Sequence, residues 1–306
     1  MMKTKRLFIL VVLVGLFFTA STAMADVLVS ADWLKKNLDN PNIRIVDVQN
    51  KPGSYDKGHI PNAAKVTRHV DLEDYTKYPP NKYPGINQFL ELMKRLGIDN
   101  NTTVVAYDDH HGIFASRMIF VMELYGHDVS KLKILDGGIK EWKKKGYPVT
   151  TKPFNFKQKK PYMTKGPNLN LIVTWQDVFR DVVQKQRPDV VLHDARPSPE
   201  YNGTNIRAIR GGHIPGAINV TGVNAANYKE SQLYRPADEI RKAFANAGIT
   251  PDKTVYTYCH SSDRAAHAYV VLKHILGYPD VKIYEGAWKE WGALTALPAE
   301  DEVWVK

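Results

Sequence analysis

The sequence predicts an α/β fold in which two tandem domains each contain a mainly parallel sheet flanked by helices. Two observations support this prediction. Short apolar runs of strand length alternate with helical patterns along the 306-residue chain, and parallel strands need such crossovers between them. The same alternation recurs at a spacing of about 150 residues. Three blocks of similar residues repeat in the same order, so we interpret the chain as a tandem duplication.

Each repeated block pairs a segment of the first copy with one of the second. The strand 43–48 leads to the turn Gly58-His59-Ile60-Pro61, as the strand 190–194 leads to Gly212-His213-Ile214-Pro215. Leu96-Gly97-Ile98 precedes the strand 103–107, as Ala247-Gly248-Ile249 precedes the strand 254–258. The segment 134–142 matches 283–291, and both end in Lys-Glu-Trp.

Helices are expected where apolar residues recur at helical spacing behind a capping residue. In the first copy, Ser30 or Asp32 caps a helix that contains Trp33 and Leu34, and two more helices cover 86–96 and 114–124. In the second copy, Thr174 begins a helix over 175–183, followed by helices over 240–247 and 267–276. Between the copies, 151–169 lacks periodicity and is rich in Lys, Pro, Gly and Asn, which indicates a linker.

The first 25 residues have the pattern of a secretory signal peptide. Lys3, Lys5 and Arg6 precede an apolar run over 7–18, and Ala23-Met24-Ala25 follows as a cleavage site. The run is shorter than the roughly 20 residues that a membrane span needs. We therefore expect a periplasmic or secreted protein that begins at Asp26 and has no membrane association after cleavage.

Composition narrows the classes of partner. The formal charge of +10 includes the three basic leader residues and is otherwise scattered, which favours small anions over nucleic acid. We expect a monomer. The chain has one cysteine, so no internal disulfide forms, although exported proteins often rely on them. A lone thiol in an oxidising compartment is either buried or used, and its place in a polar loop favours use.

That cysteine, Cys259, follows the β-branched and aromatic strand 254–258 and precedes the helical pattern. A thiol between a strand end and a helix N-terminus lies where N–H groups and the helix dipole stabilise an anion. Thiols in such places have a lowered pKa and act as nucleophiles. A buried, inert core thiol is the alternative, and the four polar residues that follow speak against it.

The first copy has Asp108 where the second has Cys259, within Asp108-Asp109-His110-His111-Gly112. A carboxylate is no sulfur nucleophile and fills the anion site with the protein's own charge. We expect the N-terminal domain to be inactive and to wall one side of the active cleft. A metal site at Asp108, Asp109, His110 and His111 is a weaker alternative, because adjacent residues in one turn rarely converge on one ion.

Together these motifs resemble a tandem-domain rhodanese, a thiosulfate sulfurtransferase, over nearly all of the mature sequence. The resemblance rests on the two Gly-His-Ile-Pro turns, Asp194-Ala195-Arg196, the loop from Cys259 to Arg264, and Gly286-Ala287-Trp288. It implies an N-terminal rhodanese-like domain over 26–150, a linker over 151–169 and a catalytic domain over 170–306. It also implies a Cys259 that cycles through a persulfide, with no metal or organic cofactor.

The chemistry expected of the loop is sulfur transfer from a small anionic donor to a thiophilic acceptor. A Cys259 thiolate attacks the outer sulfur of thiosulfate, and cyanide or a thiol then removes that sulfur from the persulfide. The N–H groups of His260, Ser261, Ser262, Asp263 and Arg264 are expected to line the pocket. Four residues separate Cys259 from Arg264, whereas cysteine-dependent phosphatases have five, so phosphatase or arsenate-reductase activity is less favoured.

Other residues near the site have more modest expected roles. Arg196 either attracts the donor or pairs with Glu200 to brace the loop, and Asp194 is a structural acceptor. Ser261 and Ser262 form the loop and donate hydrogen bonds to the persulfide, while an exposed His260 tunes the thiol. Asp263 is expected to face outward, because it would repel a dianion. His59 and His213 recur in both copies, which indicates structural roles, and Trp288 and Trp291 are expected in the core.

The choice of donor depends on the residues around the loop. Two-domain thiosulfate and mercaptopyruvate enzymes resemble each other in placing an arginine near Glu200, where this chain is acidic. The loop after Cys259 matches neither type. We favour thiosulfate, because export makes the cytosolic mercaptopyruvate less available. Mercaptopyruvate sulfurtransfer, a persulfide carrier without turnover and a non-catalytic sensor of oxyanions are the alternatives.

Overall fold

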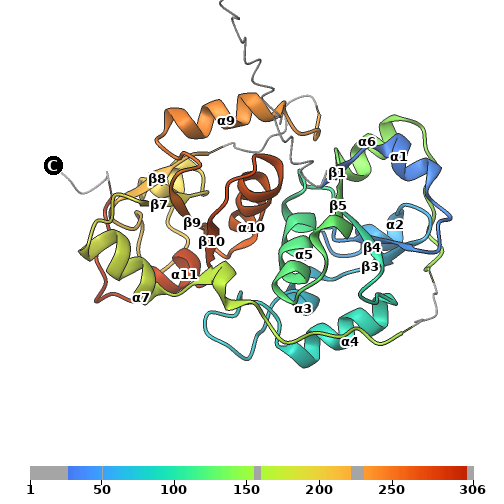
Figure 1. Ribbon diagram of the computed structural model, residues 1–306, viewed down its shortest axis with the longest axis horizontal. Helices are drawn as coiled ribbons and strands as arrows, with labels where there is room; N and C mark the ends of the chain where they lie inside the picture. Colours follow the sequence, from blue (N-terminus) through green and yellow to red (C-terminus); the bar gives the residue numbers. More distant parts are fainter. Residues whose placement is uncertain (1–26, 50, 155–159, 222–230, 302–306) are drawn as a thin grey trace, which may run out of the picture.

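The computed structural model describes residues 27–49, 51–154, 160–221 and 231–301. The expected signal peptide, 1–25, lies outside the described residues. Two α/β domains lie side by side, coloured blue to green and yellow to red in Figure 1. Each contains a five-stranded sheet in which every neighbouring pair is parallel. The predicted fold class is confirmed.

The two sheets have the same topology. The N-terminal sheet has the order β1-β5-β4-β2-β3, and the C-terminal sheet has the order β6-β10-β9-β7-β8. The first set is β1 (Leu28–Val29), β2 (Ile43–Asp47), β3 (Ala63–Lys65), β4 (Thr103–Tyr107) and β5 (Leu132–Leu135). The second set is β6 (Ile172–Val173), β7 (Val190–Asp194), β8 (Ala217–Asn219), β9 (Thr254–Tyr258) and β10 (Val281–Tyr284). The middle strands are therefore β4 and β9.

Helices connect and cover the strands. In the N-terminal domain they are α1 (Ala31–Lys36), α2 (Ser54–Lys57), α3 (Arg68–Asp71), α4 (Ile86–Leu96), α5 (Ile113–Leu124) and α6 (Gly138–Lys144). In the C-terminal domain they are α7 (Trp175–Val178), α8 (Ser198–Tyr201), α9 (Ala237–Asn246), α10 (Asp263–Val270) and α11 (Ala287–Trp291). Two π-helical turns, Phe179–Gln184 and Val271–Ile275, continue α7 and α10. Within the described residues, none of the helices is both long and apolar enough to cross a bilayer.

The predicted caps form as expected. Ser30 is the N-cap of α1, where its hydroxyl accepts the Trp33 N–H at 3.1 Å. Thr174 begins α7 with a capping box that includes Asp177. Helix α10 begins at Asp263, four residues before the predicted start. The polar residues after Cys259 read as loop, although Asp263 and Arg264 already belong to the helix.

The two domains share one apolar core. Helix α5 is buried on nearly every side and packs against α10, and both helices lie between the two sheets (Figure 1). Glu123 of α5 accepts the Tyr269 hydroxyl at 2.9 Å and pairs with His274 at 2.7 Å. This packing brings the start of α5 and the start of α10 to the same boundary between the domains.

A second contact crosses the boundary from the loop between α3 and α4, drawn in cyan in Figure 1. The Asn81 amide donates to the Glu285 carbonyl at 3.0 Å, and Lys82 pairs with Glu290 at 3.1 Å. The Tyr83 N–H also donates to the Glu285 carboxylate. The N-terminal domain therefore supports the segment between β10 and α11, which lies next to the Cys259 loop.

Candidate active site

Cys259 directly follows β9, the middle strand of its sheet, and precedes α10. Its side chain is buried, yet it lines a cleft between the two domains. The beginning of α11 holds the loop from behind, because the Trp288 N–H donates to the Cys259 carbonyl at 2.9 Å and the Lys289 N–H to the His260 carbonyl at 3.1 Å. The thiol thus lies at the carboxyl edge of a parallel sheet, where α/β proteins bind ligands.

The N-terminal domain shows what the corresponding loop binds. There the Asp108 carboxylate accepts four backbone N–H groups: from His110 at 2.8 Å and Gly112 at 2.9 Å on one oxygen, and from Phe114 at 2.8 Å and Ala115 at 3.0 Å on the other. Burial nevertheless raises the pKa of Asp108. The loop is therefore a cradle for an anion, and in this domain the protein's own carboxylate fills it. These hydrogen bonds engage both oxygens of Asp108, and within the described residues no group of three or more His, Cys, Asp or Glu side chains is arranged to hold a metal ion.

The two loops correspond at the residue that precedes each helix. Gly112 before α5 and Ser262 before α10 both have left-handed backbone angles, with φ of 77° and 68°. On this correspondence, three of the four N–H groups that face Asp108, those of Gly112, Phe114 and Ala115, are matched by those of Ser262, Arg264 and Ala265. The first N–H groups of a helix have no acceptor within the helix. Cys259 follows the middle strand of its sheet as Asp108 does, and it is one residue nearer to its helix.

Arg264 places a fixed positive charge beside the Cys259 thiol. Although burial opposes its charged form, the Cys259 side chain and Glu200 raise the pKa of the Arg264 guanidinium. The Glu200 carboxylate accepts two hydrogen bonds from this guanidinium, at 3.0 and 3.1 Å. Glu200 also forms an ion pair with Arg207 at 3.0 Å. The acidic residue at position 200 therefore positions two arginines, and half-exposed Arg207 supplies a cation to the cleft.

His260 differs from its expected exposure, and Ser262 has only the loop-forming part of its expected role. His260 is buried, not exposed, and burial together with Arg207 lowers its pKa to about 4, so the ring is neutral near pH 7. The Ser262 hydroxyl donates to the Glu285 carbonyl at 2.6 Å, so it braces the loop and does not face the sulfur. Ser261 lines the cleft, and its hydroxyl lies 3.5 Å from an Asp263 oxygen.

The prediction that Asp263 faces outward is wrong. Its side chain is buried at the boundary between the domains and forms an ion pair with Arg68 of α3. We had expected the Asp263 carboxylate to repel an anionic donor, and Arg68 of the other domain offsets this negative charge. A single sequence does not show which residues two domains bring together, so Arg68 could not be named in advance.

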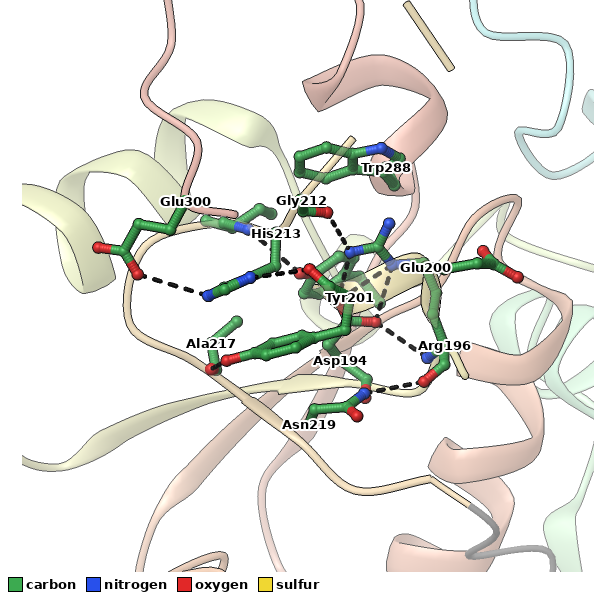
Figure 2. Close-up of polar contacts among 12 residues, drawn as sticks. Asp194, Arg196, Glu200, Tyr201, Gly212, His213, Ala217, Asn219, Trp288 and Glu300 are labelled. Atoms are coloured by element: carbon green, nitrogen blue, oxygen red, sulfur yellow. Dashed lines mark hydrogen bonds and ion pairs between the residues drawn. The ribbon is translucent and has the colours of Figure 1, made fainter. Parts of the chain in front are cut away.

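Arg196 does not line the cleft. Its guanidinium is 1% exposed, forms hydrogen bonds of 2.6 to 3.0 Å with the Asp194 carboxylate, and donates to the Gly212 carbonyl at 2.8 Å (Figure 2). It also lies 4.5 Å from the centre of the Trp288 ring. Figure 2 shows Glu200 turned away from this pair. Of its two expected roles the structure supports bracing, with Asp194 in place of Glu200 as the partner.

The repeated histidines have structural surroundings in both copies. His213 stacks on Tyr201 with ring centres 3.6 Å apart and donates from Nδ1 to the Tyr201 carbonyl at 2.9 Å (Figure 2). His59 stacks on Tyr55 at the same 3.6 Å and donates to the Tyr55 carbonyl at 2.8 Å. The same arrangement in a domain without cysteine agrees with their predicted structural role. Trp288 and Trp291 are buried in the core, as predicted.

Both domains line the cleft above Cys259, which has a volume of about 530 Å³. The C-terminal domain contributes Arg207, His260, Ser261, Asp263, Arg264 and Lys289 beside the thiol. The N-terminal domain contributes Arg68, His69, Glu73, Tyr75, Asn81, His110, Ile113 and Phe114. The expectation that the first copy walls the cleft is met. Its individual residues, like Arg207, were missed because no repeated motif marks them.

Comparisons with known proteins agree with this architecture. The model of the Rhodanese-like domain matches residues 30–145 and again 179–294. The chain is 33% identical to sulfur carrier protein TtuD of Thermus thermophilus, over 90% of this chain and 97% of that protein. It is 34% identical to "Putative thiosulfate sulfurtransferase 1" of Mycobacterium bovis, over 91% of this chain and 99% of that protein.

A solved structure shows the same fold. It is the anaerobic ergothioneine biosynthesis enzyme of Chlorobium limicola in complex with trimethyl histidine, with a TM-score of 0.80 and 24% identity over 90% of this chain and 70% of that one. The twofold match to the domain model and the similarity to the two relatives over almost their full length establish the relationship. The chain belongs to the rhodanese family, with two rhodanese-like domains in tandem.

Proposed function

We propose that the protein is a sulfurtransferase that moves a sulfane sulfur from thiosulfate to a thiophilic acceptor, such as cyanide, through a persulfide on Cys259. The observation that carries the proposal is the comparison of the two loops. One copy of the anion cradle is filled by the Asp108 carboxylate through four N–H groups. The other copy has a thiol after the corresponding strand, where the thiolate and the persulfide, both anions, would be stabilised by the matching N–H groups.

The two steps balance without a cofactor. The Cys259 thiolate attacks the outer sulfur of thiosulfate; an S–S bond forms to Cys259, and sulfite leaves with the electron pair of the bond that breaks. Cyanide then attacks the outer sulfur of the persulfide, leaves as thiocyanate and regenerates the thiolate. Both the cradle N–H groups and Arg264 face negative charge throughout, so the same groups serve each step.

Thiosulfate suits the charges of the cleft. Arg207 and Lys289 line it beside Cys259, and their positive charge favours a dianion over a monoanion such as mercaptopyruvate. A comparison of kcat/KM for the two donors tests this preference. Higher efficiency with mercaptopyruvate would replace the proposed donor and leave the Cys259 chemistry in place.

A persulfide carrier is the second candidate, and the similarity to TtuD favours it. The carrier and the enzyme differ in turnover. With thiosulfate and cyanide in excess, the enzyme releases many thiocyanate molecules per chain, whereas a carrier releases about one. Cys259→Ser should abolish release in either case. Full thiocyanate formation by that variant would contradict the use of Cys259.

The proposed setting is the periplasm or the exterior of the cell, and the N-terminal domain is proposed to be inactive. The first part rests on the leader pattern of residues 1–25, and the second on Asp108. N-terminal sequencing of the mature protein should begin at Asp26; a chain that retains Met1 would contradict export by this leader.

A further inference from the structure

Asp263 poses an electrostatic problem for the proposed chemistry. It is the first residue of α10, four residues after Cys259, and it lines the same cleft as the thiol. Its side chain is buried, and burial raises the pKa of its carboxyl. A negative charge so close to a thiolate disfavours the thiolate and also repels an anionic donor. A neighbouring cation is needed to cancel this charge.

The cation comes from the domain without cysteine. Arg68, the first residue of α3, forms an ion pair with Asp263 through Nη1, and their side chains are only 13% and 8% exposed. The Arg68 guanidinium also lies 4.5 Å from the centre of the Phe114 ring. Phe114 belongs to the first turn of α5, which carries the Asp108 cradle.

The pair is more than a surface salt bridge. Exposed ion pairs contribute little because water screens them, whereas breaking a buried pair leaves an uncompensated charge. Arg68 is itself held by its neighbours, since Glu73 lies 3.8 Å from its Nη1 and pairs with His69 at 2.9 Å. A guanidinium suits this position better than a lysine ammonium, because it can stack on the Phe114 ring and bind the Asp263 carboxylate at the same time.

We propose that Arg68 is a positioning residue of the Cys259 site: by pairing with Asp263 it fixes the first turn of α10 and cancels the carboxylate charge beside the thiol. The N-terminal domain thereby completes the active site of the other domain. The consequence for sulfur transfer rests on the proposed function, whereas the consequence for the reactivity of the thiol does not.

The charged and titratable groups around Cys259 come from both domains. Arg68, His69, Glu73 and His110 line the cleft from the N-terminal domain, and Arg207, His260, Asp263, Arg264 and Lys289 line it from the C-terminal domain. Arg264 and Arg207 share the single carboxylate of Glu200, which leaves one net positive charge there. Burial raises the pKa of Asp263, whereas the charges of Arg68 and of Arg117 in α5 lower it, and Arg68 forms an ion pair with it. Removing Arg68 or Asp263 should therefore change the net charge beside the thiol in opposite directions.

The experiment measures the rate of Cys259 alkylation by iodoacetamide against pH, because only the thiolate reacts. Arg68→Gln should raise the midpoint of this profile by about one pH unit, and Asp263→Asn should lower it by a similar amount. The double variant should return to the wild-type midpoint. With thiosulfate, Arg68→Gln should lower kcat/KM by roughly tenfold, and the added Asp263→Asn should restore most of the loss.

Arg95→Gln is the matched control, since Arg95 forms a salt bridge with Asp71 in the same domain outside the cleft; its midpoint should equal that of the wild type. Unchanged midpoints in both single variants would overturn the proposal, as would a double variant no better than Arg68→Gln. If Arg68→Gln does not fold, the proposal is tested by Asp263→Asn alone: a lower alkylation midpoint supports it, and an unchanged midpoint contradicts it. If the wild type forms no persulfide, the proposed function fails, and the alkylation profiles still test Arg68.

Discussion

At the residue scale, one side chain at the end of the middle strand decides what each cradle does. Asp108 and Cys259 follow β4 and β9, and the carbonyl of each accepts an N–H from the segment after the next strand: Ile139 at 3.1 Å and Trp288 at 2.9 Å. The backbone around them is thus alike. A carboxylate satisfies the N–H groups by itself, whereas a thiolate satisfies them and remains a nucleophile.

The Asp108 cradle predicts a stability effect without loss of chemistry. Asp108→Asn replaces one acceptor oxygen by a donor that faces two N–H groups, so the free energy of unfolding should fall by about 2 kcal/mol. Urea denaturation measures this change, with Asp56→Asn as an exposed control. Thiocyanate formation should persist, because Cys259 lies in the other domain. An unfolding free energy equal to that of the control would contradict the cradle.

At the element scale, the ends of β2 and β7 differ by one arginine. Asp194 pairs with Arg196, whereas the corresponding Asp47 has Gln49 two residues on. Asp47 accepts the Tyr107 hydroxyl at 2.6 Å and is 1% exposed. Burial without a cationic partner raises the pKa of its carboxyl to about 7, and the hydrogen bond from Tyr107 only partly opposes this.

This difference predicts a pH dependence of stability. Because the folded pKa lies above the unfolded one, Asp47 stabilises the fold while protonated, and this contribution is lost as pH rises from about 4 through 7. The loss amounts to roughly 4 kcal/mol. Gln49→Arg provides the missing cation and should flatten the dependence, and Gln176→Arg, at an exposed position on α7, serves as a control. Parallel stability curves for wild type and Gln49→Arg between pH 4 and 8 would contradict this account.

Many of the helices and strands were predictable from the sequence. The helix over 86–96 and the strands 103–107 and 254–258 have the bounds expected from their periodicity. The start of α10 was not predicted, because Asp263 and Arg264 are polar and the turn at Ser262 has no glycine to mark it. The acidic residue at 200 was puzzling in the sequence, since only the folded chain shows that it positions Arg207 and Arg264.

At the scale of the whole molecule, the two domains form one structural unit around α5 and α10. The sequence predicted the duplication and the cleft wall but not the contacts, because docking depends on side chains far apart along the chain. Arg68 and Asp263 are 195 residues apart. Glu123, Tyr269 and His274 form a second such cluster.

The shared core predicts cooperative unfolding. Far-UV and near-UV circular dichroism should report one coincident transition, since neither domain can separate without exposing the α5–α10 contact. Glu123→Ala leaves the buried Tyr269 hydroxyl without its acceptor and should lower the unfolding free energy by about 2 kcal/mol. Glu91→Ala, at an exposed position on α4, should have little effect. Two separate transitions in the wild type would contradict a single unit.

The central claim is that Cys259 carries the transferred sulfur, and mass spectrometry of the protein after thiosulfate treatment tests it most directly. The account predicts a mass increase of about 32 Da, one sulfur atom, on the peptide that contains Cys259. Cyanide should remove this mass and release an equal amount of thiocyanate. A Cys259 peptide of unchanged mass in a preparation that still produces thiocyanate would contradict the account.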